Sequence, residues 1–379
     1  MATISYMKTG VLDNGAISQL GKLLQRQGGA RPFIVTDAGI RAAGVLDKVI
    51  ENLGVEPVDI FDETLANPEE AQAEIAAERY KQGKADSIIA VGGGSSLDMA
   101  KMVGIMVTHE GPWSRYGVAE RGGKHIKPIP PFIAIPTTSG TGSEVSAGAM
   151  ITMRAGFKEL FFADNLLPDI ALCDPELTIG LPAGLTAATG MDAVTHCVES
   201  ILSPNANPVA DAIALDGLER AVGWGMLKRA VAEGSDKDAR YNMMLASYEG
   251  AMAFVKGLGS VHALSHAAGR LTDLRPHHGT LNAIWLPHVL RFNADAPGMD
   301  AAYARIRRAM GLADNADLAD EIAKLNADIG LPEGLKSLGF TSEHGDGVVD
   351  YALKDLATRT NPKAPDRSDY ERLYDVALG

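Results

Sequence analysis

The chain has 379 residues, of which 46% are hydrophobic and 22% charged, and this length and balance are typical of a well-packed globular protein with two domains. Its formal net charge of −13 excludes a broad basic face for nucleic acid, because phosphates are neutralised by Lys and Arg. No apolar run approaches the length of a membrane span.

The first ten residues, MATISYMKTG, lack the cationic and apolar regions of a signal peptide. The only cysteines are Cys173 and Cys197, which are too few for a disulfide framework and fit a reducing compartment. We therefore expect a cytoplasmic protein with no membrane or nucleic-acid partner.

The first half of the chain alternates strand and helix patterns. Short apolar runs that end in turn residues predict buried strands in 32–37, 86–94 and 131–140. Helical spacing predicts helices over 73–83 and 95–107. This alternation favours a parallel sheet with crossover helices, and ligands gather beyond the carboxyl ends of such strands.

After about residue 180 the pattern becomes helical in period, with few strand signals. The segment LPAGL (181–185) is a plausible hinge. We expect an α/β N-terminal dinucleotide-binding domain over 1–180 and an all-α, metal-binding C-terminal domain over 181–379.

Two glycine- and hydroxyl-rich turns follow separate strands of the expected sheet. In GGGSSLDMAK, Gly93 and Gly94 precede a helix that Ser95 helps to open, and backbone N–H groups at a helix start can cradle a pyrophosphate. In IPTTSGTGSE, Thr137, Thr138 and Thr141 offer hydroxyls for phosphate or ribose. The alternative is that both are turns without a ligand, since the spacing matches neither GxGxxG nor the P-loop.

Asp37 is the last residue of the strand expected over 32–37. A carboxylate at this place can accept hydrogen bonds from a ribose diol and would repel a 2′-phosphate, which favours NAD over NADP. The same residue could cap the helix that begins near Ile40, and taken by itself Asp37 favours this capping role; both roles stay open.

The helical half contains two pairs of possible metal ligands. Asp192 and His196 are four residues apart, as are His262 and His266, and residues at this spacing share one face of a helix. A further pair of adjacent histidines, 277–278, precedes a glycine. Mixed nitrogen and oxygen ligands suit Fe²⁺ or Zn²⁺; the alternative for each His is an ordinary hydrogen-bonded residue.

Five stretches in collinear order resemble the iron-containing (group III) alcohol dehydrogenase family. They are GGGSSLDMAK, IPTTSGTGSE, LPDIALCDPELT, ATGMDAVTHCVES and GSVHALSHAAG followed by HHGTLNAIWLPHVL. The resemblance runs from about residue 10 to about residue 370. It implies a dinucleotide-binding domain and a helical domain with the metal in the cleft between them.

The resemblance also assigns roles to individual positions. It implies four metal ligands: Asp192, His196, His262 and the histidine directly before the glycine, His278. It places His266 near the nicotinamide and substrate, with a role in proton transfer or orientation. The positions it associates with the cofactor are Asp37, Gly93, Gly94, Ser95, Asp98, Thr137, Thr138 and Lys158.

The implied activity is hydride transfer between a nicotinamide cofactor and a small alcohol, hydroxy acid or semialdehyde. The implied cofactors are NAD rather than NADP, and Fe²⁺ with Zn²⁺ as the alternative; the implied assembly is a homodimer or larger. Such a metal acts as a Lewis acid that polarises the alcohol or carbonyl oxygen. The run 269–279 departs from the family pattern because it is longer.

Other activities of related folds stay open. One is the reduction of an acidic ring-cleavage product, as in maleylacetate reductases, whose carboxylate Lys256, Arg270 or Arg275 could bind, although surface charges are the more ordinary reading of all three. Another is a lyase reaction like that of dehydroquinate synthase. A nucleotide-binding protein without catalysis is the reading from a different class, and the intact set of metal-binding residues argues against it.

Overall fold

The computed structural model describes residues 8–271 and 273–379. The first seven residues, which include most of the segment without signal-peptide character, lie outside the described residues. The chain divides into two compact units: of the described residues, one unit holds 8–138 together with Gly142–Gly180, and the other holds Ser139–Thr141 together with Leu181–Gly379. Within the described ranges, no helix is long and apolar enough to cross a membrane.

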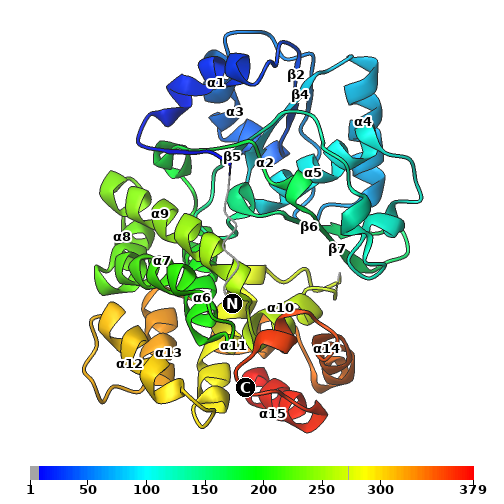
Figure 1. Cartoon of the computed structure of the whole chain (residues 1–379). Helices are drawn as coiled ribbons and strands as arrows, with labels where there is room; N and C mark the ends of the chain where they lie inside the picture. Colours follow the sequence, from blue (N-terminus) through cyan, green and yellow to red (C-terminus); the bar gives the residue numbers. More distant parts are fainter. Residues whose placement is uncertain (1–7, 272) are drawn as a thin grey trace. The chain divides into compact units, whose positions relative to one another are not determined.

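The first unit is built on a six-stranded parallel sheet (Figure 1). Its strand order is β1-β8-β5-β4-β2-β3. The strands are β1 (Gly10–Leu12), β2 (Pro32–Val35), β3 (Asp59–Phe61), β4 (Ser87–Gly92), β5 (Phe132–Pro136) and β8 (Ile170–Cys173). The three strands expected from the sequence are β2, β4 and β5, and they are confirmed as neighbours in the sheet.

Helices cover both faces of this sheet (Figure 1). They are α1 (Leu20–Arg26), α2 (Ala38–Ala42), α3 (Val45–Glu51), α4 (Glu70–Gln82) and α5 (Gly94–Thr108). Alternate strand residues face opposite sides: Ile88 and Ala90 pack with α4 and α5, whereas Ile89 and Val91 pack with α1 and α3. A strand buried on both faces reads as a continuous apolar run, which is why the sequence revealed β4 so clearly.

A separate antiparallel pair, β6 (Gly148–Thr152) and β7 (Lys158–Phe162), packs against α5. We did not predict it from the sequence. Strand β6 has five residues, and buried residues alternate in it with half-buried ones. Ala149 and Ile151 are the two that face the core, and so short an alternation is a weak signal in the sequence.

The second unit is entirely helical, as expected. Its helices are α6 (Ala183–Leu202), α7 (Pro208–Leu218), α8 (Met226–Ala232), α9 (Lys237–Ala253), α10 (Ser260–Ala268), α11 (His278–Asn293), α12 (Met299–Ala309), α13 (Leu318–Asp328), α14 (Gly345–Ala352) and α15 (Arg367–Leu378). Helix α6 is buried from Thr186 to its end and packs against α7, α9 and α11. It is therefore the central helix of this unit and fixes whatever polar groups it carries.

Candidate active site

The carboxyl ends of β2, β4 and β5 bring three predicted cofactor segments together. The strand order reverses between β2 and β4, and ligands of open parallel sheets bind at such a reversal. Ser96 Oγ donates to Asp37 Oδ2 over 3.0 Å, and a Cβ added to Gly93 would lie 3.4 Å from Thr138 Cγ2. The loops that follow the three strands therefore line one edge of the sheet.

The glycine turn after β4 suits a phosphate group. Gly92 has φ 148°, and a Cβ there would come within 2.5 Å of Ser96 Oγ, so only glycine fits. Gly93 is the N-cap residue of α5 and makes no side-chain capping bond, and no acidic residue stands in the first turn. The first N–H groups of α5 and the positive end of its dipole are left for an anion.

Asp37 accepts hydrogen bonds through both of its carboxylate oxygens. Its Oδ1 accepts from the Ile40 N–H over 3.0 Å, which makes it the N-cap of α2, and its Oδ2 accepts from Ser96. The helix starts at Ala38, two residues earlier than expected. The capping role is confirmed, and the cofactor role stays a prediction.

Three further predicted cofactor side chains make hydrogen bonds within their own unit. The bonds are Ser95 Oγ to Ala66 O at 2.6 Å, Lys158 Nζ to Asn67 Oδ1 at 2.7 Å, and Asp98 accepting from Ser143 Oγ at 2.6 Å and Met150 N at 2.9 Å. Of these, Asp98 is turned toward the GTGSE loop. One of its oxygens accepts from Ser143 in the loop that follows β5, and the other accepts from Met150 in β6, so Asp98 supports both.

The hydroxyl residues after β5 do not form one group. Thr137 is buried, and its hydroxyl has no hydrogen-bond partner among the residues that the structure describes. Thr138 is half-buried. Thr141 belongs to the helical unit, in a segment that packs on α6 so closely that a Cβ at Gly140 would lie 2.6 Å from Thr189 O. Thr137 and Thr138 thus belong to the unit that contains the sheet, and the cofactor role of Thr141 stays a prediction.

Lys101 is a residue of this region that we did not single out. It is fully buried, and its Nζ lies 2.7–2.9 Å from the carbonyl oxygens of Ser143, Ser146 and Gly148 and from Ser143 Oγ. Burial lowers the pKa of Lys101 to about 8, with Asp98 acting against that shift. Lys101 could have been identified from the sequence, because it stands among the apolar residues of α5. A lysine buried there needs hydrogen-bond acceptors.

The helical unit gathers four potential metal ligands around one carboxylate oxygen. Asp192 and His196 come from α6, His262 from α10 and His278 from the first position of α11. Asp192 Oδ1 lies 3.7 Å from the Nε2 atom of His196 and 3.6 Å from the Nε2 atoms of His262 and His278. Ligand atoms about 2.1 Å from a tetrahedral ion stand about 3.4 Å apart, so each of these separations suits two ligands of one ion. The ligand atoms of Asp192, His196 and His262 also lie within 4.8 Å of one another, and His278 adjoins this group through Asp192.

A close helix crossing brings His278 to this position. A Cβ on Gly279 would lie 2.0 Å from Ala188 O and 3.3 Å from Asp192 Cβ, so the glycine lets the start of α11 touch α6. His278 lies inside the cluster, while His277 is the exposed residue that precedes α11. The geometry therefore favours His278 of the adjacent pair.

The charges in the cluster suit a cation. Burial raises the pKa of Asp192, but the nearby His196, His278 and His262 outweigh it and hold the pKa well below its usual range. Burial lowers the pKa of His196 to about 4 and holds that of His278 well below its ordinary value. The site thus contains one anion, Asp192, and two imidazoles, those of His196 and His278, that are held in the neutral form that binds a metal.

His262 differs from the other two histidines because a carboxylate faces each of its ring nitrogens. Burial lowers its pKa, but Asp192 on the Nε2 side and Glu199 on the Nδ1 side outweigh burial and raise the pKa to about 9. An ion on Nε2 would take the place of the proton there. Glu199 itself lies seven residues after Asp192 on the same face of α6, a spacing that could have identified it in the sequence.

Asn282 is a second residue that sequence reasoning missed. It lies one turn after His278, and its Nδ2 donates to Asp192 Oδ1 over 2.7 Å and lies 3.3 and 3.2 Å from Nε2 of His262 and His278. Its Oδ1 is buried without a partner among the described residues. An orphaned polar atom beside a cluster of ligands is expected where an ion or water completes the site.

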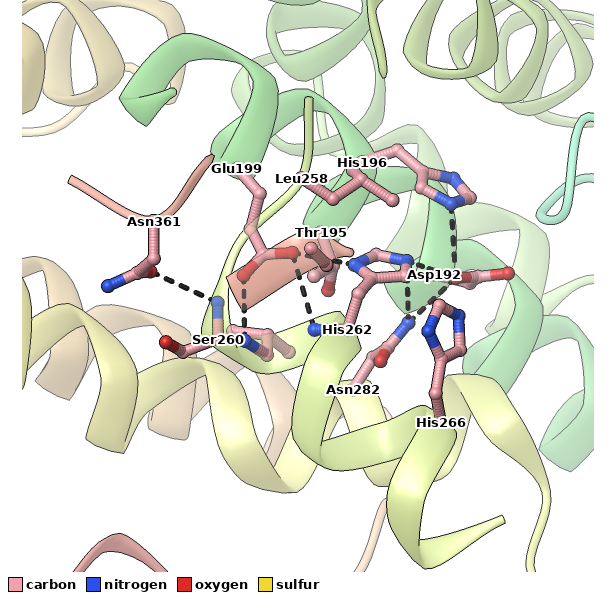
Figure 2. A network of polar contacts seen from close by, with 12 residues as sticks. Asp192, Thr195, His196, Glu199, Leu258, Ser260, His262, His266, Asn282 and Asn361 are labelled. Atoms are coloured by element: carbon pink, nitrogen blue, oxygen red, sulfur yellow. Dashed lines mark hydrogen bonds and ion pairs between the residues drawn. The ribbon is translucent and has the colours of Figure 1, made fainter. Parts of the chain in front are cut away.

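His266, the predicted catalytic residue, stands at the edge of the cluster (Figure 2). Its ring stacks on that of His278 at 5.3 Å, and its Nδ1 lies 3.0 Å from Asp355 Oδ2. The side chains of His266 and His278 keep 30% and 37% of their surface exposed, against 1–5% for Asp192, His196 and His262. The cluster is therefore open on the side of these two histidines.

The three cations considered for a substrate carboxylate have different surroundings. Lys256 is buried, with its Nζ 2.6 Å from Asp211 Oδ1, so its interpretation as a surface charge was wrong. The Arg270 guanidinium lies 3.9 Å from the centre of the Tyr351 ring. Arg275 is exposed, on the segment between α10 and α11.

The comparisons with known proteins cover both units. Residues 8–175 match the family model "Iron-containing alcohol dehydrogenase", and residues 186–378 match "Fe-containing alcohol dehydrogenase family, C-terminal". The chain is 51% identical to a 4-hydroxybutyrate dehydrogenase of Cupriavidus necator over 100% of both chains. It is 38% identical to a 1,3-propanediol dehydrogenase of Citrobacter freundii over 96% of this chain and 95% of that protein.

Solved structures give the same result. A 1,3-propanediol oxidoreductase matches with a TM-score of 0.92 at 36% identity over 100% of both chains. A sulfoacetaldehyde reductase of Bifidobacterium kashiwanohense, solved in complex with NAD⁺, matches with a TM-score of 0.89 at 26% identity over 100% of this chain and 99% of that one. With both family models matched in order along nearly all of its length, the chain belongs to the iron-containing alcohol dehydrogenase family.

Proposed function

We propose that this alcohol dehydrogenase interconverts a short hydroxy acid of the 4-hydroxybutyrate type and its semialdehyde, with NAD and one Fe²⁺ or Zn²⁺ ion. The observation that carries the metal-dependent chemistry is the set of three imidazole Nε2 atoms within 3.7 Å of Asp192 Oδ1. The substrate class rests on 51% identity to a 4-hydroxybutyrate dehydrogenase over the full length of both chains.

In this proposal, Asp192, His196, His262 and His278 would hold the ion, and the burial of the first three would limit the access of water to it. A bound ion supplies Lewis-acid polarisation of the alcohol or carbonyl oxygen. His266, whose Nδ1 is held by Asp355, takes up or delivers the hydroxyl proton at Nε2. Its stacking on His278 keeps it next to the open side of the site.

The cofactor is assigned to the sheet edge of the first unit. Gly93, Gly94 and Ser95 at the start of α5 would hold the pyrophosphate, and Asp37 would accept from the ribose diol. Thr137 and Thr138 would lie on the adenine and ribose side. The carboxylate of Asp37 opposes a 2′-phosphate, and for this reason we propose NAD rather than NADP.

The substrate carboxylate has two candidate partners, Arg270 and Arg275. Both lie between His266 and His278, in the run that is longer than the family pattern. Replacing the partner that binds the carboxylate by Ala raises the KM for 4-hydroxybutyrate about 10-fold or more and leaves the KM for 1,3-propanediol unchanged, since a charged hydrogen bond contributes about 1.5–3 kcal/mol.

The test is a metal-defined assay. Protein stripped of metal and reloaded with Fe²⁺ under anaerobic conditions, or with Zn²⁺, is given NAD⁺ or NADP⁺ and each of a panel of alcohols. We expect NADH formation with kcat/KM highest for 4-hydroxybutyrate. Absence of turnover with every metal and substrate would contradict the proposal, as would higher activity with maleylacetate or phosphate elimination from the dehydroquinate synthase substrate.

A diol such as 1,3-propanediol is the second candidate, because the chain matches a 1,3-propanediol oxidoreductase along its full length. A higher kcat/KM for the diol than for the hydroxy acid would select it. The family resemblance further predicts a homodimer or larger assembly, which light scattering of the purified protein measures directly.

A further inference from the structure

A buried carboxylate, Glu199, is used by none of the roles above. It is 3% exposed and lies on α6, three residues after His196 and seven after Asp192, so the three side chains share one face of the helix. A buried carboxylate is costly unless it is paired or hydrogen-bonded. The groups that satisfy it therefore indicate what it does.

The hydrogen-bond donors to Glu199 among the described residues belong to the first turn of α10 (Figure 2). Its Oε1 accepts from the Val261 N–H over 2.8 Å. Its Oε2 lies 2.6 Å from His262 Nδ1 and 3.4 Å from the His262 nitrogen of the main chain. The first N–H groups of a helix have no partner within the helix, and α10 has no capping bond from its own N-cap residue, Gly259. Glu199 thus caps α10 from a different helix while it also holds the ring of His262.

Gly259 shows how closely this carboxylate approaches the chain. A Cβ at Gly259 would lie 2.8 Å from Glu199 Oε1 and 2.8 Å from Asn361 Oδ1. The φ of Gly259 is −143°, which any residue can adopt, so the close approach alone requires glycine here. Glu199 and Asn361, from two separate segments of the chain, therefore both lie close to Gly259.

The ring of His262 is fixed by its two nitrogens. Nδ1 donates to Glu199, and Nε2 faces Asp192 Oδ1 at 3.6 Å and Asn282 Nδ2 at 3.3 Å. A histidine that binds a metal through one nitrogen usually donates the other N–H to a carboxylate, which sets its tautomer and raises its basicity. Figure 2 shows Glu199 and Asp192 on opposite sides of the His262 ring.

We propose that Glu199 is the positioning residue of the metal site: its hydrogen bond to Nδ1 holds His262 with Nε2 directed to the ion, and its capping of α10 fixes the helix that carries this ligand. The inference rests on the proposed function only in taking His262 as a metal ligand. No other role of Glu199 is needed to explain its burial, because each of its two oxygens accepts a hydrogen bond, one from Val261 and the other from His262.

Asn361 provides a matched control. Its Oδ1 accepts from the Ser260 N–H over 3.0 Å, and its Nδ2 donates to Asn293 Oδ1 over 2.8 Å. It therefore caps the same helix one residue earlier without bonding to the His262 ring. A substitution at Asn361 disturbs the start of α10 and leaves the bond between Glu199 and Nδ1 in place.

The experiment compares zinc affinity in the full chain by competition with a chromophoric chelator. We expect Glu199→Ala to bind Zn²⁺ about 10–100-fold more weakly than the wild type, the usual effect of removing such a partner. Glu199→Gln keeps the shape of the side chain but has one accepting oxygen for two donors, so its zinc affinity should lie between those of the wild type and Glu199→Ala. Asn361→Ala binds Zn²⁺ within about 2-fold of the wild type after correction for its melting temperature, since the imidazole bond remains.

A second measurement keeps the proposal testable if Glu199→Ala folds poorly. In the zinc-loaded wild type labelled with ¹⁵N-histidine, the Nδ1–H of His262 should appear as a downfield, slowly exchanging proton, and Glu199→Gln should move it upfield. Unchanged zinc affinity and an unchanged signal in the Glu199 variants would overturn the inference, as would equal weakening in Asn361→Ala. A wild type that binds no zinc or iron would instead overturn the proposed metal site itself.

Discussion

The two candidate sites of this chain are built in different ways. The metal cluster in the helical unit consists of side chains that point to one position from α6, α10 and α11, and most of them are buried. The cofactor edge of the sheet consists mainly of backbone, with a glycine turn and a helix start that has no side-chain capping bond. Many polar side chains around that edge already make internal hydrogen bonds, among them Ser95, Asp98 and Lys158.

This difference implies that substitutions of side chains have larger effects at the metal cluster than at the sheet edge. Removing a ligand side chain from the helical cluster removes part of the site itself, because no backbone group replaces it. Replacing a polar side chain at the sheet edge mostly changes the support of a loop. We therefore expect the largest effects at the metal ligands, intermediate effects at the glycine turn, and small effects at buried polar groups outside both sites.

Asp192→Ala should show the largest effect. Asp192 is the only carboxylate among the four proposed ligands and stands 3.6–3.7 Å from the other three, so we expect bound metal to be lost and kcat/KM to fall by more than about 10³-fold. NADH binding, measured by fluorescence, should stay within about 2-fold of the wild type. Retained metal by elemental analysis, or a parallel loss of NADH binding, would break the separation of the two sites.

Gly92→Ala should affect the other site selectively. The φ of 148° and the 2.5 Å approach to Ser96 Oγ leave no room for a Cβ, so the turn must shift away from the pyrophosphate. We expect the KM for NAD⁺ to rise about 10–100-fold, as misplacement of a bound group commonly costs, while metal content stays at the wild-type level. Gly28→Ala, at a turn with φ 80° and open space, is the matched control for backbone strain alone.

Asp37→Asn should change the preference between the two nicotinamide cofactors. Asn is as good an N-cap as Asp, so the bond to Ile40 is kept while the charge that opposes a 2′-phosphate is lost. We expect the ratio of kcat/KM for NAD⁺ to that for NADP⁺ to fall about 10-fold, with the melting temperature nearly unchanged. An unchanged ratio would leave Asp37 with its capping role only.

Glu249→Gln should have the smallest effect, and only at high pH. Burial, followed by the hydrogen bond and charge of Asp216, raises the pKa of Glu249 to about 9. Because the folded-state pKa lies above the unfolded one, the stability that the protonated form provides is full below about pH 4 and is lost as the pH rises through about 9.

Gln cannot ionise, so the Glu249→Gln variant should gain stability over the wild type as the pH rises from about 5 to about 9. We expect a gain of about 2–4 °C in melting temperature at about pH 9, the shift that about 1 kcal/mol gives in a domain of this size, and no gain at about pH 4. Activity should not change. Equal melting temperatures at the higher pH would show that Glu249 is not held protonated by the fold.

The sequence predicted the elements that have strong periodicity. Strand β4 was visible because burial on both faces makes its residues continuously apolar, and α6 was visible because its apolar spacing is helical. Asp192 and His196 could be paired because four residues complete about one turn. The hairpin β6–β7 was missed because its strands are short and only half-buried.

Contacts between distant segments could not be predicted from local pattern. Nothing in the sequence near Lys101 shows that its acceptors come from residues 143–148, and nothing near Asp98 shows that its carboxylate bonds to Ser143 and Met150. Asp355, which holds His266, lies 89 residues after it. The domain boundary near residue 180 and the roles of the cofactor residues stay predictions.

The adjacent histidines before α11 allow the most direct test of the metal site. Zinc binding to metal-free protein is measured by calorimetry for the wild type, His278→Ala and His277→Ala. We expect one site per chain in the wild type, loss or at least about 100-fold weakening in His278→Ala, and wild-type affinity in His277→Ala. Equal affinity in His278→Ala and the wild type, or loss of binding in His277→Ala alone, would contradict the account.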